Sequence, residues 1–136
     1  MAVIAVNPFV MKDVTLLIAA DNYESNVSAV EFVPSASPVN WKGLTPTSTY
    51  SDIGTATWVC NLSFAQDWAS ATSLSRYLFE HEGAAVACEF SPIAGGPAFG
   101  GTLVITPGSI GGAVDSVAVA TVSLGVQGRP VEITVV

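Results

Sequence analysis

Two segments of the chain have an apolar residue at every second position, with polar residues among the positions between. In residues 56–64 the even positions are apolar, and the polar residues Thr57, Asn61 and Ser63 lie between them. Residues 84–90 repeat the pattern, with Val86, Cys88 and Phe90 apolar and Glu89 polar. A period of two places alternate side chains on opposite faces of a strand. Both segments are therefore predicted to be strands with one buried face.

Five further segments are rich in β-branched and aliphatic residues, which favour strands. They span residues 14–20, 26–33, 101–106, 114–126 and 130–136. Glycine-rich residues 94–101 and 107–112 are predicted to be turns between strands, because glycine accepts positive φ without steric penalty. The chain of 136 residues contains no internal repeat. We predict one mainly β domain over residues 1–136, a sandwich or barrel-like fold with one flanking helix.

That helix is predicted over about residues 67–80. Trp68, Ala71, Leu74, Leu78 and Phe79 recur there at helical spacing. Residues 63–66 resemble a capping box, Asp67 is an alternative cap, and Gly83 is a plausible stop. A stripe of this kind usually packs on a core, so we expect an amphipathic helix laid against the sheet.

Residues 34–54 contain three prolines and many hydroxyl side chains, which predicts a long loop between strands. Loops of this length in compact domains are usually functional or disordered. Trp41, Leu44 and Tyr50 argue against simple disorder, because exposed aromatic residues gain from burial in a partner. The loop either folds over its own core or contacts a neighbouring molecule.

Charge is scarce: 11% of residues are charged, where about 25% is usual. Such a surface suits a subunit that buries its flanks against other copies. The net charge is −7, and the only bases are Lys12, Lys42, Arg76 and Arg129. Four scattered bases do not make a phosphate-binding patch, so we expect no grip on DNA. We also find no membrane-spanning run and no secretory signal, which predicts folding in a cytoplasm without a membrane partner.

The residues offer little for catalysis, and we predict no enzyme activity, no cofactor and no metal. Cys60 and Cys88 lie on apolar faces, which favours buried free thiols over a disulfide or metal site. The single histidine, His81, lies between two glutamates at the expected helix end, without a nucleophile elbow in the sequence. Glu80, Glu82 and Glu89 could at most contribute to a weak calcium site. Residues 95–101 lack the lysine of a phosphate-binding loop.

Residues 58–83, with a strand followed by a helix, resemble the corresponding segment of the major tail proteins (tail-tube proteins) of bacteriophages with long, non-contractile tails. Residues 100–112 and 118–130 are similar to the same family, and the resemblance extends over about residues 22–130. It implies a β-sandwich flanked by one helix. It also implies six-membered rings of identical subunits, stacked into a tube in the virion tail and assembled in the host cytoplasm.

The resemblance further implies that one sheet of each subunit lines a channel through which DNA passes without specific binding. The long loop would reach a neighbouring ring, with Trp41, Leu44 and Tyr50 as inter-subunit contacts. An acidic channel would repel phosphates, and Glu31, Glu89 and Asp115 are the candidates to face it. The partners implied are further copies of the chain and the tail initiator, terminator and tape-measure proteins.

Two other functions fit the same residues. One is an adhesion or carbohydrate-binding β-sandwich, in which Trp41 and Tyr50 would stack on sugars. The other is the tube of a bacterial secretion or contractile device.

Overall fold

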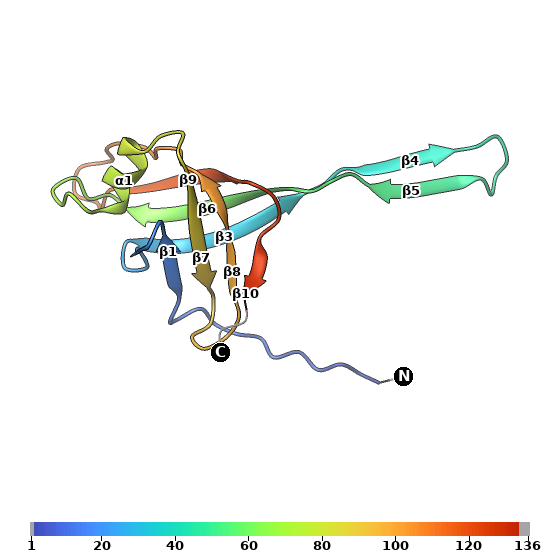
Figure 1. Cartoon of the computed structure of the whole chain (residues 1–136), viewed down its shortest axis with the longest axis horizontal. Coiled ribbons are helices and arrows are strands. Elements are labelled where there is room, and N and C mark those ends of the chain that lie inside the picture. Colours follow the sequence, from blue (N-terminus) through green and yellow to red (C-terminus); the bar gives the residue numbers. More distant parts are fainter. Residues whose placement is uncertain (1, 134–136) are drawn as a thin grey trace.

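A computed structural model describes residues 2–133 and shows a mainly β protein with one helix, as predicted. Figure 1 gives the arrangement, a curved β body from which a long hairpin projects. The elements are β1 (Thr15–Ile18), β2 (Asp21–Asn22), β3 (Val27–Ser35), β4 (Pro38–Lys42), β5 (Thr49–Ile53), β6 (Thr57–Ala65), α1 (Leu74–Glu80), β7 (Ala85–Ser91), β8 (Ala98–Val104), β9 (Val119–Val126) and β10 (Val131–Ile133).

The body is one antiparallel sheet in the order β2-β1-β7-β8-β9-β6-β3, with β10 paired to β8. The sheet curls on itself, so that β3 and β6 run across the direction of β7 and β8 (Figure 1). One long ladder pairs all of β9 with β6, from Trp58 opposite Val126 to Ala65 opposite Val119. The chain therefore encloses its core within a single folded sheet whose two end strands are β2 and β3.

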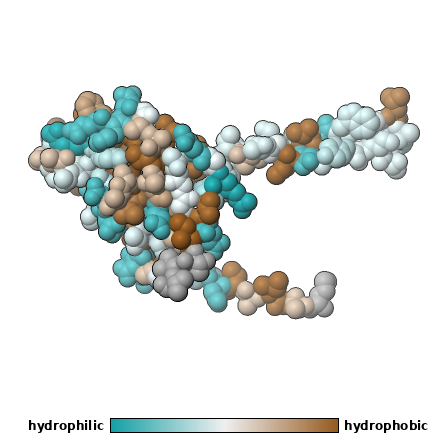
Figure 2. Space-filling view, viewed as in Figure 1, coloured by the Kyte–Doolittle hydropathy of each residue, from teal (hydrophilic) through white to brown (hydrophobic). Residues whose placement is uncertain are grey.

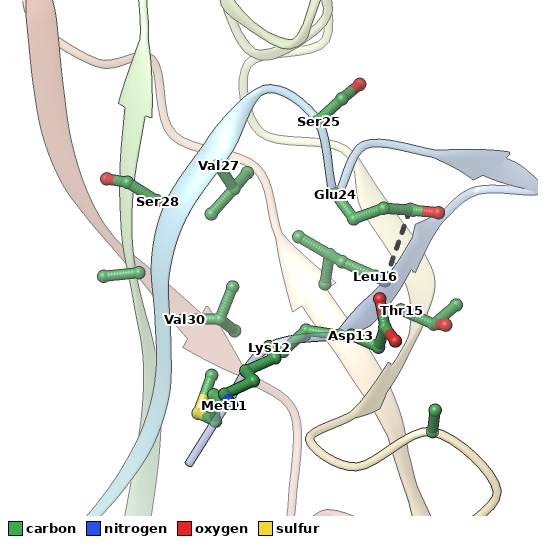
Figure 3. Close-up of a pocket in the computed structure, with 13 residues that line it drawn as sticks. Met11, Lys12, Asp13, Thr15, Leu16, Glu24, Ser25, Val27, Ser28 and Val30 are labelled. Carbon is green, nitrogen blue, oxygen red and sulfur yellow. Dashed lines mark hydrogen bonds between the residues drawn. The ribbon is translucent and has the colours of Figure 1, made fainter.

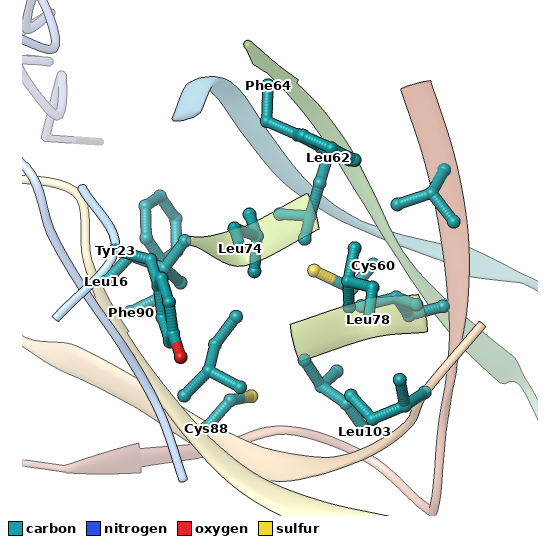
Figure 4. Packing of buried hydrophobic residues seen from close by; sticks show 14 of the residues in the cluster. Leu16, Tyr23, Cys60, Leu62, Phe64, Leu74, Leu78, Cys88, Phe90 and Leu103 are labelled. Carbon is teal, nitrogen blue, oxygen red and sulfur yellow. The ribbon is translucent and has the colours of Figure 1, made fainter. Parts of the chain in front are cut away.

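The core consists of the inward side chains of this sheet. Cys60, Leu62 and Phe64 of β6 are buried, as are Cys88 and Phe90 of β7, so the alternation predicted for both segments is confirmed. Figure 4 shows them converging with Leu16 of β1, Leu103 of β8 and two leucines of α1. Burying a large aliphatic or aromatic side chain contributes roughly 1.5–3 kcal/mol to folding.

The helix is shorter than the sequence predicts. It starts at Leu74 and not near residue 67, because β6 continues to Ala65 and the chain turns before the helix begins. The cap is Ser73, whose Oγ accepts from the backbone N–H of Arg76; the Asp67 side chain instead accepts from the N–H groups of Ala69 and Ser70. The predicted capping box is therefore wrong.

The helix is still laid against the sheet. Leu74 and Leu78 are fully buried, whereas Phe79 is more than half exposed and meets Trp68 edge-on, with ring centroids 6.1 Å apart. One face of α1 thus covers the end of the barrel that lies away from the hairpin (Figure 1).

The prediction of a long loop over residues 34–54 is wrong. Most of it forms the antiparallel hairpin β4–β5, in full register from Pro38 opposite Ile53 to Lys42 opposite Thr49. Pro38 can begin β4 because a two-stranded ribbon has open edges where a missing N–H is tolerated. The turn predicted at residues 94–101 does join β7 to β8, but residues 107–112 belong to a longer connection, 105–118, between β8 and β9.

Candidate assembly surfaces

The hairpin β4–β5 extends the strands β3 and β6 well beyond the body (Figure 1). Trp41 lies directly opposite Tyr50, and these side chains are 62% and 58% exposed. Because the pair sits on neighbouring strands, the two rings share one face of the ribbon with Val39 and Asp52. The structure therefore brings together two of the residues predicted to contact another subunit.

The third predicted contact, Leu44, lies in the connecting turn and is fully exposed. The turn is closed by the backbone N–H of Gly43, which donates to the carbonyl of Ser48 (2.6 Å). A Cβ at Gly43 would lie 2.7 Å from the Ser48 Cβ and 3.1 Å from the Trp41 ring. Glycine is thus needed at position 43 for the Trp41 ring to fold over the turn. Figure 2 shows the far end of the hairpin as a hydrophobic tip.

Hydrogen bonds within the hairpin define both of its faces. The Tyr50 hydroxyl donates to Asp52 (3.0 Å), and on the opposite face the Ser51 hydroxyl donates to Asn40 (2.7 Å). The backbone N–H of Ile53 and the Tyr50 hydroxyl together hold the pKa of Asp52 below its usual value. Asp52 therefore carries its charge beside the aromatic pair.

All ten residues of β4 and β5 are exposed. An isolated two-stranded hairpin is at best marginally stable in water. A ribbon that presents Trp41, Tyr50, Leu44 and Ile53 to solvent gains most from burial against another surface. The hairpin is therefore a candidate surface for contact with a partner.

A second surface is the outer face of β3, β6 and β9. Glu31, Asn61 and Ser123 lie side by side in register across the three strands, and the Ser123 hydroxyl donates to the Asn61 side-chain oxygen (2.5 Å). A shallow hollow of about 440 Å³ opens over this face. Its lining is Ala29, Glu31, Asn61, Leu62, Ser63, Thr121, Val122 and Ser123, which includes one acid and no base.

The three residues predicted to face a channel do not lie together. Glu31 is on the outer face of β3, whereas Glu89 is on the outer face of β7, opposite Leu17 of β1 and Gly100 of β8. Asp115 lies in the 105–118 connection, exposed and in the left-handed region with φ 66°. One flat wall could not be formed by all three.

The cysteines and the histidine considered for catalysis or metal binding are held in contacts that support the fold. Cys60 and Cys88 are buried and free, and burial raises the pKa of the Cys60 thiol to about 12 and that of Cys88 to about 11. His81 caps α1 and stacks on Tyr77, with its Nδ1–H donating to the Tyr77 carbonyl (3.0 Å). Within residues 2–133, no three His, Cys, Asp or Glu side chains gather as metal ligands would, so Glu80, Glu82 and Glu89 form no calcium site there.

Another hollow, of about 280 Å³, opens at the base of the hairpin. It is lined mostly by aromatic rings, from Phe32, Trp58, Phe90 and Phe99, with Arg129 and Pro130. This lining suits an apolar side chain better than a polar substrate. No helix in the described part of the chain has the length and apolar character needed to cross a bilayer.

Sequence reasoning missed two surfaces. The prolines of residues 34–54 hide the hairpin strands, although the sequence does single out Trp41 and Tyr50 as candidate contacts. The other is residues 2–12, an extended and largely apolar segment that precedes β1. Its run of Val, Ile and Phe was a signal that could have been used.

Comparison with known proteins gives matches in fold alone. No family model matches the sequence, and no curated protein matches it. A chain of the virion of a native gene transfer agent (GTA) particle has a TM-score of 0.64 at 16% identity, covering 88% of this chain and 95% of that chain. A chain of the tail of an empty GTA particle, a structure with C6 symmetry, has a TM-score of 0.60 at 17% identity, covering 85% and 93%.

Proposed function

We propose that this chain is the structural subunit of a phage-like tail tube, in which six-membered rings of the chain stack around a channel for DNA. The fold it shares with chains of a GTA virion and of a C6-symmetric GTA tail supports a tail subunit. The shared length supports it too, since the match covers most of both chains. The subunit does no chemistry and belongs to the virion tail.

The single observation that carries this proposal is the projecting hairpin. A monomer gains nothing from a ribbon that exposes Trp41, Tyr50 and Leu44 along its length. A subunit that reaches a neighbouring ring buries the same residues, and a contact between different patches on identical subunits repeats to give rings or filaments. The tail initiator, terminator and tape-measure proteins would start, end and measure such a tube.

The outer face of β3, β6 and β9 is our choice for the channel wall. It presents Glu31 among amide and hydroxyl groups, and the four bases lie elsewhere: before β1, in β4, in α1 and before β10. A protein that neutralises even six phosphates binds DNA with a log–log salt slope of roughly −5. A wall without bases avoids such binding and lets the duplex pass.

Electron microscopy of the purified protein at high concentration tests the proposal. We expect rings or tubes with an open channel wide enough for a DNA duplex. Isolated monomers at every concentration, even after addition of tail-initiation proteins, would contradict it. That result would favour a carbohydrate-binding module in which Trp41 and Tyr50 stack on sugars.

A further inference from the structure

The N-terminal arm, residues 2–12, lies outside the β body and runs away from it (Figure 1). Its large apolar side chains are strongly exposed, with Val3 at 96% and Ile4 at 91%. Residues 2–11 contain no charged side chain. Such a segment is rich in strand-forming residues and exposes more apolar surface than an unpartnered segment usually does.

The sheet has a gap at which such a segment could be accommodated. Its order ends with β3, which pairs with β6 on one side and, within residues 2–133, with no strand on the other. A hollow of about 450 Å³ lies between β3 and the start of β1, lined by residues 11–16 on one side and residues 27–30 on the other. Figure 3 shows Val27 and Val30 directed from β3 towards Leu16 of β1, whereas Ser28 points away.

We propose that the N-terminal arm of one copy adds as a strand to the free edge of β3 in a second copy. A free edge presents unpaired N–H and C=O groups, and an extended segment satisfies them by β-augmentation. Ile4 and Val6 then lie over the hollow beside Val30. This inference rests on the self-assembly proposed above. It specifies which segment of one copy and which strand edge of the next would meet.

Two prolines limit where the strands can pair. Pro8 has no N–H to donate, so the pairing segment of the arm is residues 2–7. Pro34 limits the edge of β3 in the same way, and the irregularity between Val27 and Ala29 marks its other end. The usable edge, residues 29–33, is therefore one residue shorter than the pairing segment of the arm, so the arm can pair along all of it.

The arm is better suited to a second copy than to its own. It joins β1 through residues 11–14, which form part of the wall of the hollow and contain no glycine or proline. To enter its own gap the arm would have to reverse direction within these four residues. In the structure the arm instead continues outwards, where an adjacent subunit could receive it (Figure 1).

Cysteine cross-linking tests the contact. Ala5→Cys in one tagged copy is mixed with Ala29→Cys or Glu31→Cys in a differently tagged copy, since these positions lie two residues apart on one face of β3 and cover neighbouring registers. We expect a disulfide-linked pair containing one copy of each, in several-fold excess over that formed with Thr121→Cys. Thr121 is the matched control because it is exposed on the same outer face, two strands away.

The outcomes separate this contact from tube formation. Cross-linking no greater than with the Thr121→Cys control, while the wild-type chain still forms tubes, overturns the arm contact alone. A disulfide that forms only within a chain carrying both Ala5→Cys and Ala29→Cys also overturns it. Cross-linked pairs without rings support the arm contact and count against the tube.

A second pair of variants guards against effects of the introduced thiols. Val6→Asp should abolish assembly, because it places a charge over the hollow, while Val10→Asp, beyond Pro8, should assemble as the wild type does. Both side chains are exposed, at 80% and 76%, so neither variant should change the melting temperature. Equal assembly by the two variants overturns the proposal.

Discussion

The rings of Phe32 in β3 and Phe90 in β7 meet across the interior of the folded sheet, with centroids 6.0 Å apart and planes tilted by 42°. Adjacent residues on a strand point to opposite faces. Glu31 and Glu89, each next to one of these rings, therefore point out of the molecule in opposite directions. A channel wall formed by one face of the subunit includes one of them and excludes the other.

Glu31→Lys should leave assembly intact and impair DNA delivery. The substitution puts a base on the outer face of β3, β6 and β9, where it would contact phosphates of the passing duplex. Six-fold repetition in each ring would multiply the effect. Delivery is measured as infectious or transducing titre per assembled particle, with particles counted by electron microscopy.

Glu89→Lys is the matched control, because it makes the same charge change on the opposite face. It should leave the titre unchanged. The reverse result, with Glu89→Lys harmful and Glu31→Lys neutral, would place the channel wall on the β1–β7–β8 side.

Replacing Trp41 and Tyr50 together with serine should prevent ring stacking without unfolding the subunit. Both side chains are more than half exposed, and exposed substitutions usually change stability by only about 0.5 kcal/mol. Aromatic residues at the centre of an interface contribute about 2 kcal/mol or more each, so loss of both should weaken association by roughly several hundred-fold. Sedimentation velocity measures the association, and a thermal melt checks the fold.

Thr49→Ala serves as the control for the hairpin, because Thr49 is exposed on the other face of the ribbon. It should assemble normally. Normal tubes from the Trp41 and Tyr50 double variant would show that the aromatic pair is not an inter-ring contact.

Strands of the body could be predicted from sequence because their burial is one-sided. Cys60, Leu62 and Phe64 alternate with polar residues that face solvent, so the pattern records the fold directly. The start of the helix could not be predicted in this way. Trp68 continues the apolar spacing of Leu74 and Leu78, but it packs on Phe79 from a turn.

The hairpin escaped prediction for a different reason. Its residues are exposed on both faces, so no core imposes an apolar–polar alternation on them. The hydroxyl-rich strand β5 and the proline at the start of β4 then look like a loop. The N-terminal arm is likewise exposed, so the burial pattern of its own chain says nothing of what it contacts. For the same reason the pattern does not distinguish the outer face that carries Glu31 from the one that carries Glu89.

The two thiols should be unreactive in the folded protein at pH 8. Burial raises the pKa of Cys60 to about 12 and that of Cys88 to about 11, from 9.0 for an exposed thiol, so little thiolate forms. A thiol-specific chromogenic reagent should detect less than one group per chain before denaturation and both groups after it.

The same pKa shifts predict a loss of stability in alkali. Because the thiol pKa values are raised in the folded protein, the unfolded chain releases its thiol protons first as pH rises. The two buried neutral thiols therefore make their full contribution to the free energy of unfolding below pH 9. It should decline as pH rises from 9 towards 11 and 12. The measurement is the denaturant midpoint of unfolding as a function of pH, and replacing both cysteines with alanine should make its decline less steep. A decline as steep as that of the wild type would mean that other groups cause it.

Gln66 should control the order of the 105–118 connection. Its Nε2 donates to the carbonyls of Gly111 (2.9 Å) and Val119 (3.1 Å), while its Oε1 accepts from the N–H of Gly111 (2.9 Å) and from the Trp68 indole (3.2 Å). One side chain thus ties the connection to the turn before α1. Gln66→Ala removes all four bonds and should reduce stability by about 1–3 kcal/mol, since each contributes about 0.5–1.5 and the site is part-exposed.

Hydrogen exchange locates this effect. The amides of residues 111–113 should exchange faster in Gln66→Ala, whereas those of β7, on the other side of the core, should keep their protection. Gln66→Glu retains the acceptor but loses the donor, so it should fall between wild type and Gln66→Ala. Unchanged exchange in Gln66→Ala would mean that other contacts suffice: the backbone bond from Gln66 to Ala118 (2.9 Å) and the close approach of Gly108 to the Phe64 ring.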